Sequence, residues 1–232
     1  TKRMVTVDGY SLANYANALQ RDGASILNTI RIPLLGLAIV LVVGTLLSYL
    51  AIRRKSVFTG LLDTMSMLPY IIPGTVLGIA FITAFNSGVG GTGFLAMTGT
   101  AAIMAISFSL RRLPYTVRSS EATLRQIPVT IEEAAESLGS SRLNTFLKIT
   151  LPMMASGVVS GAILTWITMI SELSTSVLLY TVKTRTMTVA IYTEVVRGNY
   201  GIAAALGTIL IAFTVASLLL FMRISKSDSL TL

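Results

Sequence analysis

Five apolar runs of roughly 20 residues constrain the fold of this 232-residue chain more than any other feature. A membrane-spanning helix needs roughly 20 mostly apolar residues. The runs cover residues 26–52, 61–85, 100–116, 152–173 and 202–222. Only 12% of the residues are charged, too few to cover the surface of a soluble domain of this length. The sequence therefore predicts an all-α, polytopic membrane protein.

The number of spans is expected to be five or six. Between the fourth and fifth runs, the apolar stretch at residues 177–182 is too short to cross a membrane. Residues 174–200 are therefore expected to form a re-entrant or interfacial segment. The alternative is that residues 176–192 belong to a sixth, weaker span.

Basic residues predict the orientation. With five spans, the loops at residues 53–60, 111–150 and 223–232 hold 11 Lys and Arg, against 7 on the other side. Because cytoplasmic loops are the more basic, we expect the chain to lie in the cytoplasmic (inner) membrane with its C-terminus inside and its N-terminus outside.

This orientation divides the chain into three parts. Residues 1–25 are expected to be an extracytoplasmic lead-in with a short amphipathic helix over residues 11–19 at the membrane interface. Residues 26–224 form the transmembrane domain, and residues 225–232 form a cytoplasmic tail. An extracytoplasmic start with no preceding span suggests that the chain is part of something longer.

Histidine and cysteine are both absent. Their absence removes the commonest general base, the thiolate nucleophile and the usual transition-metal ligands. The glycines at residues 88–93 are not followed by the Lys-Ser/Thr of a phosphate-binding loop. The net charge of +8 fits loops that meet anionic lipid rather than nucleic acid. We expect no enzyme, cofactor or metal site.

The longest cytoplasmic connection, residues 119–152, is predicted to contain a short helix. Pro128 ends whatever precedes it, and Thr130 is expected to form a capping box with Glu133. The first turns carry Glu132, Glu133 and Glu136, where the helix dipole favours anions.

Small residues and a glycine complete this predicted helix. Ala134 and Ala135 favour helix and permit close approach, and Gly139 is expected to end it. Ser140 or Ser141 then caps a second helix over residues 142–149, and Leu151-Pro152 opens the fourth span. These residues alone leave open whether the helix is a lever or an idle surface element.

The spacing of the loop carries a resemblance to a known family. Its pattern is Glu133-Ala134-Ala135, Gly139, then Ile149-x-Leu151-Pro152. This pattern resembles the EAA loop of binding-protein-dependent ABC permeases. The flanking residues 124–128 and 156–161 also agree, and residues 68–78 and 111–119 resemble that family's second and third core helices. The resemblance covers nearly the whole chain.

The resemblance implies the type I ABC importer permease fold, with residues 133–139 as a cytoplasmic coupling helix. The implied partners are a homodimer of ABC ATPase subunits, a second permease half or homologous permease domain, an extracytoplasmic solute-binding protein and membrane lipid. Since the chain has no nucleotide-binding motif, a separate ATPase would hydrolyse ATP. The implied coupling residues are Glu132, Glu133, Ala134, Ala135, Glu136, Gly139, Ile149, Leu151 and Pro152.

Breaks and charges inside the membrane suggest a transport pathway. Pro69 and Pro73-Gly74 interrupt the second run, and Glu172 lies at the outer end of the fourth. The alternative for the breaks is a structural kink. The alternatives for Glu172 are a salt bridge to a neighbouring helix or a position among the lipid headgroups. The candidate pathway or gate residues are Tyr70, Pro73, Gly74, Ser171, Glu172 and Ser174. Arg111 and Arg112 are expected to be snorkelling anchors, and Lys183, Arg185 and Arg197 either solvated loop charges or contacts for a binding protein or an anionic substrate.

The substrate is the least constrained part of the prediction. Residues 171–174, 178–180 and 186–192 most resemble ferric-iron type permeases, which are often fused two-domain chains, and this chain would then be the C-terminal half of one. Related permeases carry phosphonate, sugar phosphate, polyamine or thiamine. A secondary transporter is the alternative of another class, although it would more often carry several intramembrane carboxylates.

Overall fold

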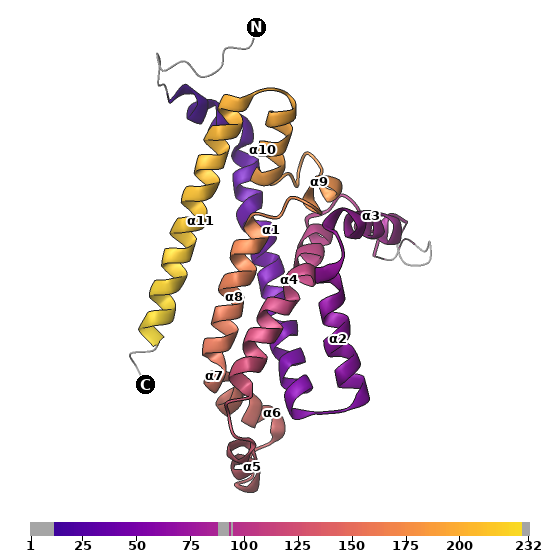
Figure 1. Ribbon diagram of the computed structural model, residues 1–232, viewed down its shortest axis with the longest axis vertical. Coiled ribbons are helices and arrows are strands. Elements are labelled where there is room, and N and C mark those ends of the chain that lie inside the picture. The colour runs from indigo at the N-terminus through magenta and orange to yellow at the C-terminus, as the bar shows by residue number, and fades with distance from the viewer. Residues whose placement is uncertain (1–11, 88–92, 94, 229–232) are drawn as a thin grey trace.

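The computed structural model describes residues 12–87, 93 and 95–228, and every regular element in these residues is a helix (Figure 1). The expected lead-in over residues 1–11, the glycine loop at 88–92 and the tail residues 229–232 lie outside the described residues. The helices are α1 (Ala13–Arg53), α2 (Val57–Ile71), α3 (Gly74–Phe85), α4 (Ala101–Leu124), α5 (Val129–Ser137), α6 (Arg142–Thr145), α7 (Leu151–Met153), α8 (Ala155–Ile170), α9 (Ser176–Leu179), α10 (Met187–Val196) and α11 (Tyr200–Asp228). A π-helical turn, Phe146–Thr150, joins α6 to α7.

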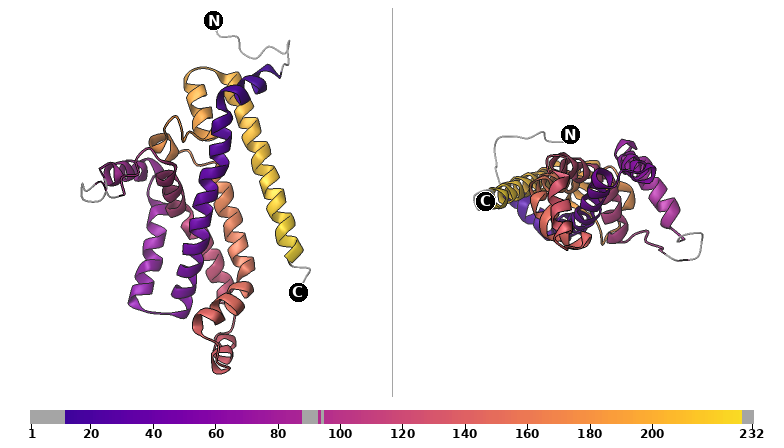
Figure 2. Two further views of the ribbon diagram at one scale, coloured as in Figure 1. Left: turned by 180° about the vertical axis from the view of Figure 1, so that it is seen from behind. Right: turned by 90° about the horizontal axis from the view of Figure 1, so that it is seen from below.

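The long helices run alongside one another and leave two different ends (Figures 1 and 2). At one end lie α5, α6, the connection from α1 to α2 and the end of α11. At the other end lie α9, α10 and the start of α1. The first and last described residues therefore lie at opposite ends of the molecule, as an odd number of spans requires.

By length and composition, α1 and α11 are long and apolar enough to cross a membrane. Two bent pairs, α2 with α3 and Arg142–Met153 with α8, raise this number to four if each pair is one span. The 24-residue α4 is also long enough, but it carries charged side chains and packs between α1 and α8. The fold is thus that of a polytopic, all-α membrane protein.

Residues 174–200 form no sixth span. Their longest helix, α10, has 10 residues, about 15 Å of helix, and it packs against α11 and α1. This agrees with a re-entrant or interfacial segment, and the sixth-span alternative is wrong.

The first helix differs from its predicted boundaries. α1 is continuous from Ala13 to Arg53, so the expected short interfacial helix is the beginning of the first span's own helix. Its buried face already starts at Ala18, Asp22 and Ser25, because the connection before α10 and α11 itself pack there.

The second span is bent by 110° between α2 and α3. Ile72 is extended, with ψ 131°, as is typical of a residue before proline, and Pro73 becomes the N-cap of α3. Pro69, which was also expected to break this span, lies inside α2 without ending it.

The fourth span begins at Ala155 and not at Pro152 as predicted. Pro152 belongs instead to the helix Arg142–Met153, which meets α8 at a 68° bend. Proline has no N–H to donate to the carbonyl of Lys148, four residues back, and this missing bond coincides with the π-helical turn at Phe146–Thr150.

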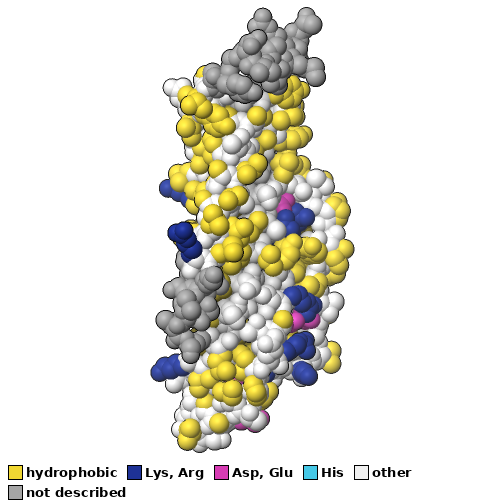
Figure 3. Space-filling view, turned by 60° about the vertical axis from the view of Figure 1, so that its left-hand side comes forward, with side chains coloured by type: hydrophobic (Ala, Val, Ile, Leu, Met, Phe, Trp, Pro, Cys, Tyr) yellow, Lys and Arg dark blue, Asp and Glu magenta, His cyan; other side chains and the backbone are white. Residues whose placement is uncertain are grey.

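The core lies where α1, α4 and α8 meet, and small residues let these helices approach closely. A Cβ on Gly161 of α8 would lie 2.6 Å from the Cα of Thr116 on α4. Ser109 of α4 donates a hydrogen bond to the carbonyl of Gly36 on α1 at 3.0 Å. Such contacts are typical of helix packing in membranes. Figure 3 shows apolar side chains over much of one flank, with Lys and Arg in small, separate groups.

Candidate functional site: a terminal helix and a buried charged cluster

α5 protrudes beyond the ends of the long helices and has well-defined boundaries (Figure 1). Pro128 is its N-cap, and the N–H of Ile131 donates to the Pro128 carbonyl at 3.3 Å. The expected capping box between Thr130 and Glu133 is therefore wrong. The helix begins one residue before Thr130, and no side chain caps it.

The end of α5 is as predicted. Gly139 has φ +91°, a left-handed conformation that favours glycine. The Ser140 N–H donates to the carbonyl of Ala135, and the Gly139 N–H donates to that of Glu136, both at 3.0 Å. This pair of bonds is a Schellman motif. Ser141 caps the next helix by accepting from the Asn144 N–H at 3.4 Å.

Glu132 turns inward and fastens α5 to the end of α1. Its carboxylate accepts from Arg53 Nε at 2.8 Å and from Tyr49 Oη at 3.3 Å. Arg53 also donates to the carbonyl of Ile127 at 2.9 Å. The side chains of Arg53 and Glu132 are only 8% and 9% exposed. Although Glu132 was predicted among the coupling residues, its contacts in this structure are within the chain.

An apolar cluster beneath α5 extends this attachment from α1 to α4, α7 and α8. Leu124, Ile127 and Met154 are buried and pack with partly buried neighbours from α1, α5, α7 and α8. The rings of Tyr49 and Phe146 lie 4.7 Å apart. A displacement of α5 must therefore also displace the long helices against which it is packed.

The opposite face of α5 is open. Glu133, Ala134, Glu136 and Gly139 are exposed, and Ala135 is half-buried. At the tip, Leu138 is 91% exposed. Of the predicted residues further along, Ile149 is half-buried, Leu151 packs into the cluster beneath α5, and Pro152 is exposed.

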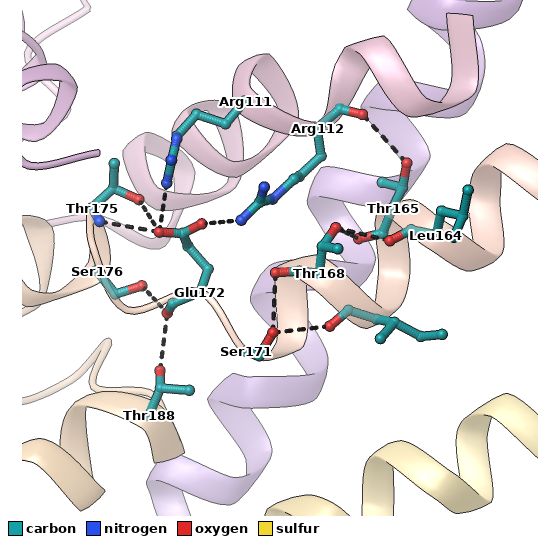
Figure 4. A network of polar contacts seen from close by, with 11 residues as sticks. Arg111, Arg112, Leu164, Thr165, Thr168, Ser171, Glu172, Thr175, Ser176 and Thr188 are labelled. Carbon is teal, nitrogen blue, oxygen red and sulfur yellow. Dashed lines mark hydrogen bonds and ion pairs between the residues drawn. The ribbon is translucent and has the colours of Figure 1, made fainter. Parts of the chain in front are cut away.

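The second candidate site is a buried charged cluster of Arg111, Arg112 and Glu172, here called the Arg–Glu cluster (Figure 4). Arg111 and Arg112 of α4 each donate to one oxygen of the Glu172 carboxylate, at 2.7 and 2.6 Å. Thr175 donates to the same carboxylate from its N–H at 3.3 Å and its hydroxyl at 3.4 Å.

Glu172 also organises the backbone after α8. Its carbonyl accepts hydrogen bonds from the hydroxyls of Ser176 at 2.8 Å and Thr188 at 3.0 Å. These two hydrogen bonds attach the non-helical connection between α8 and α9 to Glu172, and they attach the start of α10 to the same residue.

Some predicted pathway residues gather at the Arg–Glu cluster. Gly74 at the start of α3 lies so close to Ser174 and Arg111 that an added Cβ would overlap both side chains. Pro73 caps α3 beside them. Tyr70 instead packs edge-on against Tyr115 at 5.7 Å. Ser171 donates to carbonyls of α8, the helix that it follows.

Arg111 and Arg112 are not the snorkelling anchors that the sequence suggested, because their guanidinium groups point to Glu172. They, Thr175 and Thr188 were absent from the predicted site. Two consecutive arginines in an apolar run, together with a lone glutamate in the next run, were the available signal.

Basic residues at the far end are also engaged within the chain. Arg185 pairs with Asp22 and donates to Ser25 of α1 at 3.2 Å, and Arg197 donates to Glu194 at 3.0 Å. Asn28 donates to the Lys183 carbonyl at 2.8 Å. For Arg185, the prediction of a solvated loop charge is therefore wrong. Arg197 is as predicted in this respect, because its side chain is 59% exposed.

The chain matches the family described as "Binding-protein-dependent transport system inner membrane component" over residues 40–227. Among curated relatives, the ferric transport system permease protein FbpB of Actinobacillus pleuropneumoniae is 32% identical over 94% of this chain. The probable transport system permease protein NifC of Clostridium pasteurianum is 32% identical over 84% of this chain and 71% of its own length. Both are named as transport permeases and not as enzymes. The chain spans only about a third of the first of these relatives, 33% of its length.

Solved structures share the fold. A chain of a bacterial ABC transporter that imports the acidic polysaccharide alginate aligns with a TM-score of 0.81 at 17% identity, covering 96% of this chain and 85% of that one. A chain of the MetNI methionine ABC transporter aligns with a TM-score of 0.72 at 20% identity, covering 94% and 99%. With the match over residues 40–227, these findings show that the chain belongs to the binding-protein-dependent inner membrane permeases of ABC transporters.

Proposed function

We propose that this chain is the permease half of an ATP-driven importer and that α5 docks a separate ABC ATPase. One observation carries the proposal: α5 is open on one face and tightly packed on the other. Its exposed side carries Glu133, Ala134 and Leu138, while Glu132 and the cluster beneath it join α5 to α1, α4 and α8. A rigid element of this kind transmits movement between a soluble motor and membrane helices.

The proposed orientation puts α5 in the cytoplasm and the start of α1 outside. The basic run Arg53, Arg54 and Lys55 lies at the same end of the molecule as α5, which supports this direction. The proposed partners are an ATPase homodimer, a second permease half and an extracytoplasmic solute-binding protein. In support of the last, one structural neighbour is an alginate transporter in complex with a periplasmic protein.

The proposed mechanism is alternating access. ATP-driven closure of the ATPase pair draws the two coupling helices together, and the attached long helices open outward. Hydrolysis then returns them to the inward-open state. Each step requires that the ATPase bind one permease conformation better than the other, because a ligand shifts a conformational equilibrium only by its differential affinity.

The proposed pathway passes the break between α2 and α3 and the Arg–Glu cluster. A helix break at membrane depth is tolerated where it lines a cavity or packs against protein. The break at Pro73 lies beside Ser174 and Arg111, next to the non-helical connection after α8. Two interrupted helices that meet at a buried charge are a common arrangement for a transport site.

Ferric iron is the proposed substrate. The proposal rests on the relatives named as ferric transport permeases, one of which is 32% identical over 94% of this chain. Other relatives are named for sulfate and for 2-aminoethylphosphonate. The permease is therefore expected to accept the solute that its binding protein delivers.

Co-purification tests the docking proposal. The permease is co-expressed with its ATPase, and the amount of ATPase recovered is measured for Leu138→Asp and for Val182→Asp. Both wild-type side chains are more than 90% exposed, at 91% and 92%, so neither change should unfold the permease. Leu138→Asp should lose the ATPase, whereas Val182→Asp, at the opposite end, should keep it. Equal recovery with both variants would contradict the proposal.

A further inference from the structure

The Arg–Glu cluster holds more positive than negative charge. Two guanidinium groups meet one carboxylate, and the Glu172 side chain is only 2% exposed. Arginine stays protonated in proteins, so the cluster keeps a net charge of about +1 while Glu172 is ionised. An unbalanced charge at membrane depth is costly, and such charges normally have a partner.

The cluster also has unused hydrogen-bond donors. The Nε atoms of both Arg111 and Arg112 are buried and have no hydrogen-bond partner among the residues that the structure describes. A buried donor without an acceptor costs free energy, so its persistence calls for an explanation. Both arginines lie on α4 and reach the same carboxylate side by side (Figure 4).

The start of α3 adds to the positive potential. A Cβ on Gly74 would lie 2.7 Å from Nη1 of Arg111, so the N-terminal end of this 12-residue helix adjoins the guanidinium. The N-terminus of a helix carries the positive end of its dipole. Thr175 supplies further donors to Oε1 of Glu172, the same oxygen that Arg111 contacts.

The cluster is not sealed. The side chains of Arg111 and Arg112 remain 13% and 16% exposed, and Ser171 and Ser174 on either side of Glu172 are exposed. A ligand that arrives along the proposed pathway therefore meets the two arginine side chains before the less exposed Glu172.

We propose that Arg111 and Arg112 bind an oxyanion group of the transported solute, with Glu172 as a built-in counter-ion that occupies the site when no solute is present. This inference rests on the proposed transport function and names the chemistry of its pathway. Paired guanidinium groups match the geometry of phosphate, sulfate and carboxylate oxygens. Relatives named for sulfate and 2-aminoethylphosphonate carry solutes of this class.

An oxyanion site at Arg111 and Arg112 would limit the form in which iron could be transported. A bare trivalent cation would be repelled by two guanidinium groups and the positive end of α3. A ferric ion that passes this point must then travel with an anionic ligand, and that ligand is what the arginines contact.

Replacing Glu172 distinguishes the proposed oxyanion site from an ordinary salt bridge. If Glu172 and the oxyanion share the same arginines, Glu172→Gln removes a competitor and leaves two buried cations for the oxyanion to neutralise. The apparent affinity for phosphate should then rise about tenfold or more. A salt bridge that only holds α4 to the end of α8 would be weakened by the same change and gain no affinity.

The experiment uses the complete permease in a maltoside detergent free of phospholipid. The thermal unfolding midpoint is measured as sodium phosphate or sodium sulfate replaces sodium chloride at constant ionic strength. Four proteins are compared: wild type, Glu172→Gln, Arg112→Gln and Asp22→Asn. Asp22 is the matched control because it is also a buried carboxylate, but it pairs with a single arginine, Arg185.

We expect a saturable rise of the midpoint with phosphate or sulfate in wild type, a response at lower concentration in Glu172→Gln, and none in Arg112→Gln. Asp22→Asn should respond like wild type. If Glu172→Gln does not fold, the wild-type and Arg112→Gln titrations still decide. Absence of a saturable oxyanion effect in wild type, or its persistence in Arg112→Gln, would overturn the inference.

A lipid phosphate is the other source of the same chemistry. A second titration therefore adds phosphatidylglycerol in phosphate-free buffer. If this lipid reproduces the Arg112-dependent rise and abolishes the response to free phosphate, the site holds a headgroup and the assignment to solute is wrong. None of these measurements involves the ATPase, so their failure is distinct from a failure of the proposed function.

Discussion

The attachment of α5 to α1 through Glu132 predicts how much more often α5 should open when the charge of Glu132 is removed. Glu132→Gln keeps the shape of the side chain but removes its charge. Arg53 Nε then loses an ionised acceptor at 2.8 Å in a place where its side chain is 8% exposed. A hydrogen bond to a charged group is worth about 1.5–3 kcal/mol, so local opening of α5 should become roughly 10–100 times more frequent.

Amide hydrogen exchange over residues 129–138 measures this opening directly, because α5 can open without global unfolding. Glu133→Gln is the matched control, since Glu133 is exposed on the same turn and should change exchange by a small factor only. Arg53→Gln should reproduce the effect, and the double variant should show less than the sum. Equal exchange in the Glu132→Gln and Glu133→Gln proteins would refute the reasoning.

Three further predictions follow from the geometry. Because φ is +91° at Gly139, Gly139→Ala should destabilise the end of α5 by about 1–2 kcal/mol and Gly139→Asn by less, which faster hydrogen exchange of the amides at residues 139 and 140 would show. Equal destabilisation by the two substitutions would contradict this prediction. Gly161→Ala should lower the thermal midpoint by an amount equivalent to about 1–3 kcal/mol, since its Cβ would meet the α4 backbone, whereas Gly207→Ala, with open space around it, should not. Hydrogen bonds from Asn199 and Arg197 hold the pKa of Glu194 below its usual value, so stability present at neutral pH should be lost as pH falls through that lowered pKa. Asn199→Ala should flatten this dependence when thermal unfolding is followed from neutral pH down through that lowered pKa.

Local signals in the sequence predicted the end of α5 correctly but not its beginning. Gly139 was predicted as the end of the coupling helix because a left-handed position at that place favours glycine, and the structure has φ +91° there. The beginning of the same helix was misplaced by the Thr130 capping box, because Pro128 takes the N-cap position itself. Both decisions depend on a few neighbouring residues.

Prolines were harder to interpret, because their effect depends on packing. Pro33, Pro69 and Pro114 lie inside helices, whereas Pro73 accompanies a 110° bend. From the sequence, Pro69 and Pro73 were both predicted to break the second span. Only the packing of the start of α3 against Ser174 and Arg111 distinguishes the one that bends the chain.

The Arg–Glu cluster could not be predicted from the sequence for a similar reason. Glu172 and its arginines are 60 and 61 positions apart, and their meeting depends on how α4 and α8 are rotated about their axes. A salt bridge was among the alternatives for Glu172, but its partners and the excess of positive charge required the structure.

The proposed transport function depends on contact between α5 and an ATPase, and a crosslink tests that contact most directly. The chain has no cysteine, so Ala134→Cys introduces a single reactive thiol on the exposed face of α5. With the assembled transporter, a thiol-reactive photocrosslinker attached to this cysteine should join Ala134→Cys to the ATPase on illumination. The same reagent should leave Ser171→Cys, at an exposed position towards the opposite end, unjoined. An assembled, active transporter in which Ala134→Cys gives no crosslink to the ATPase would contradict the account.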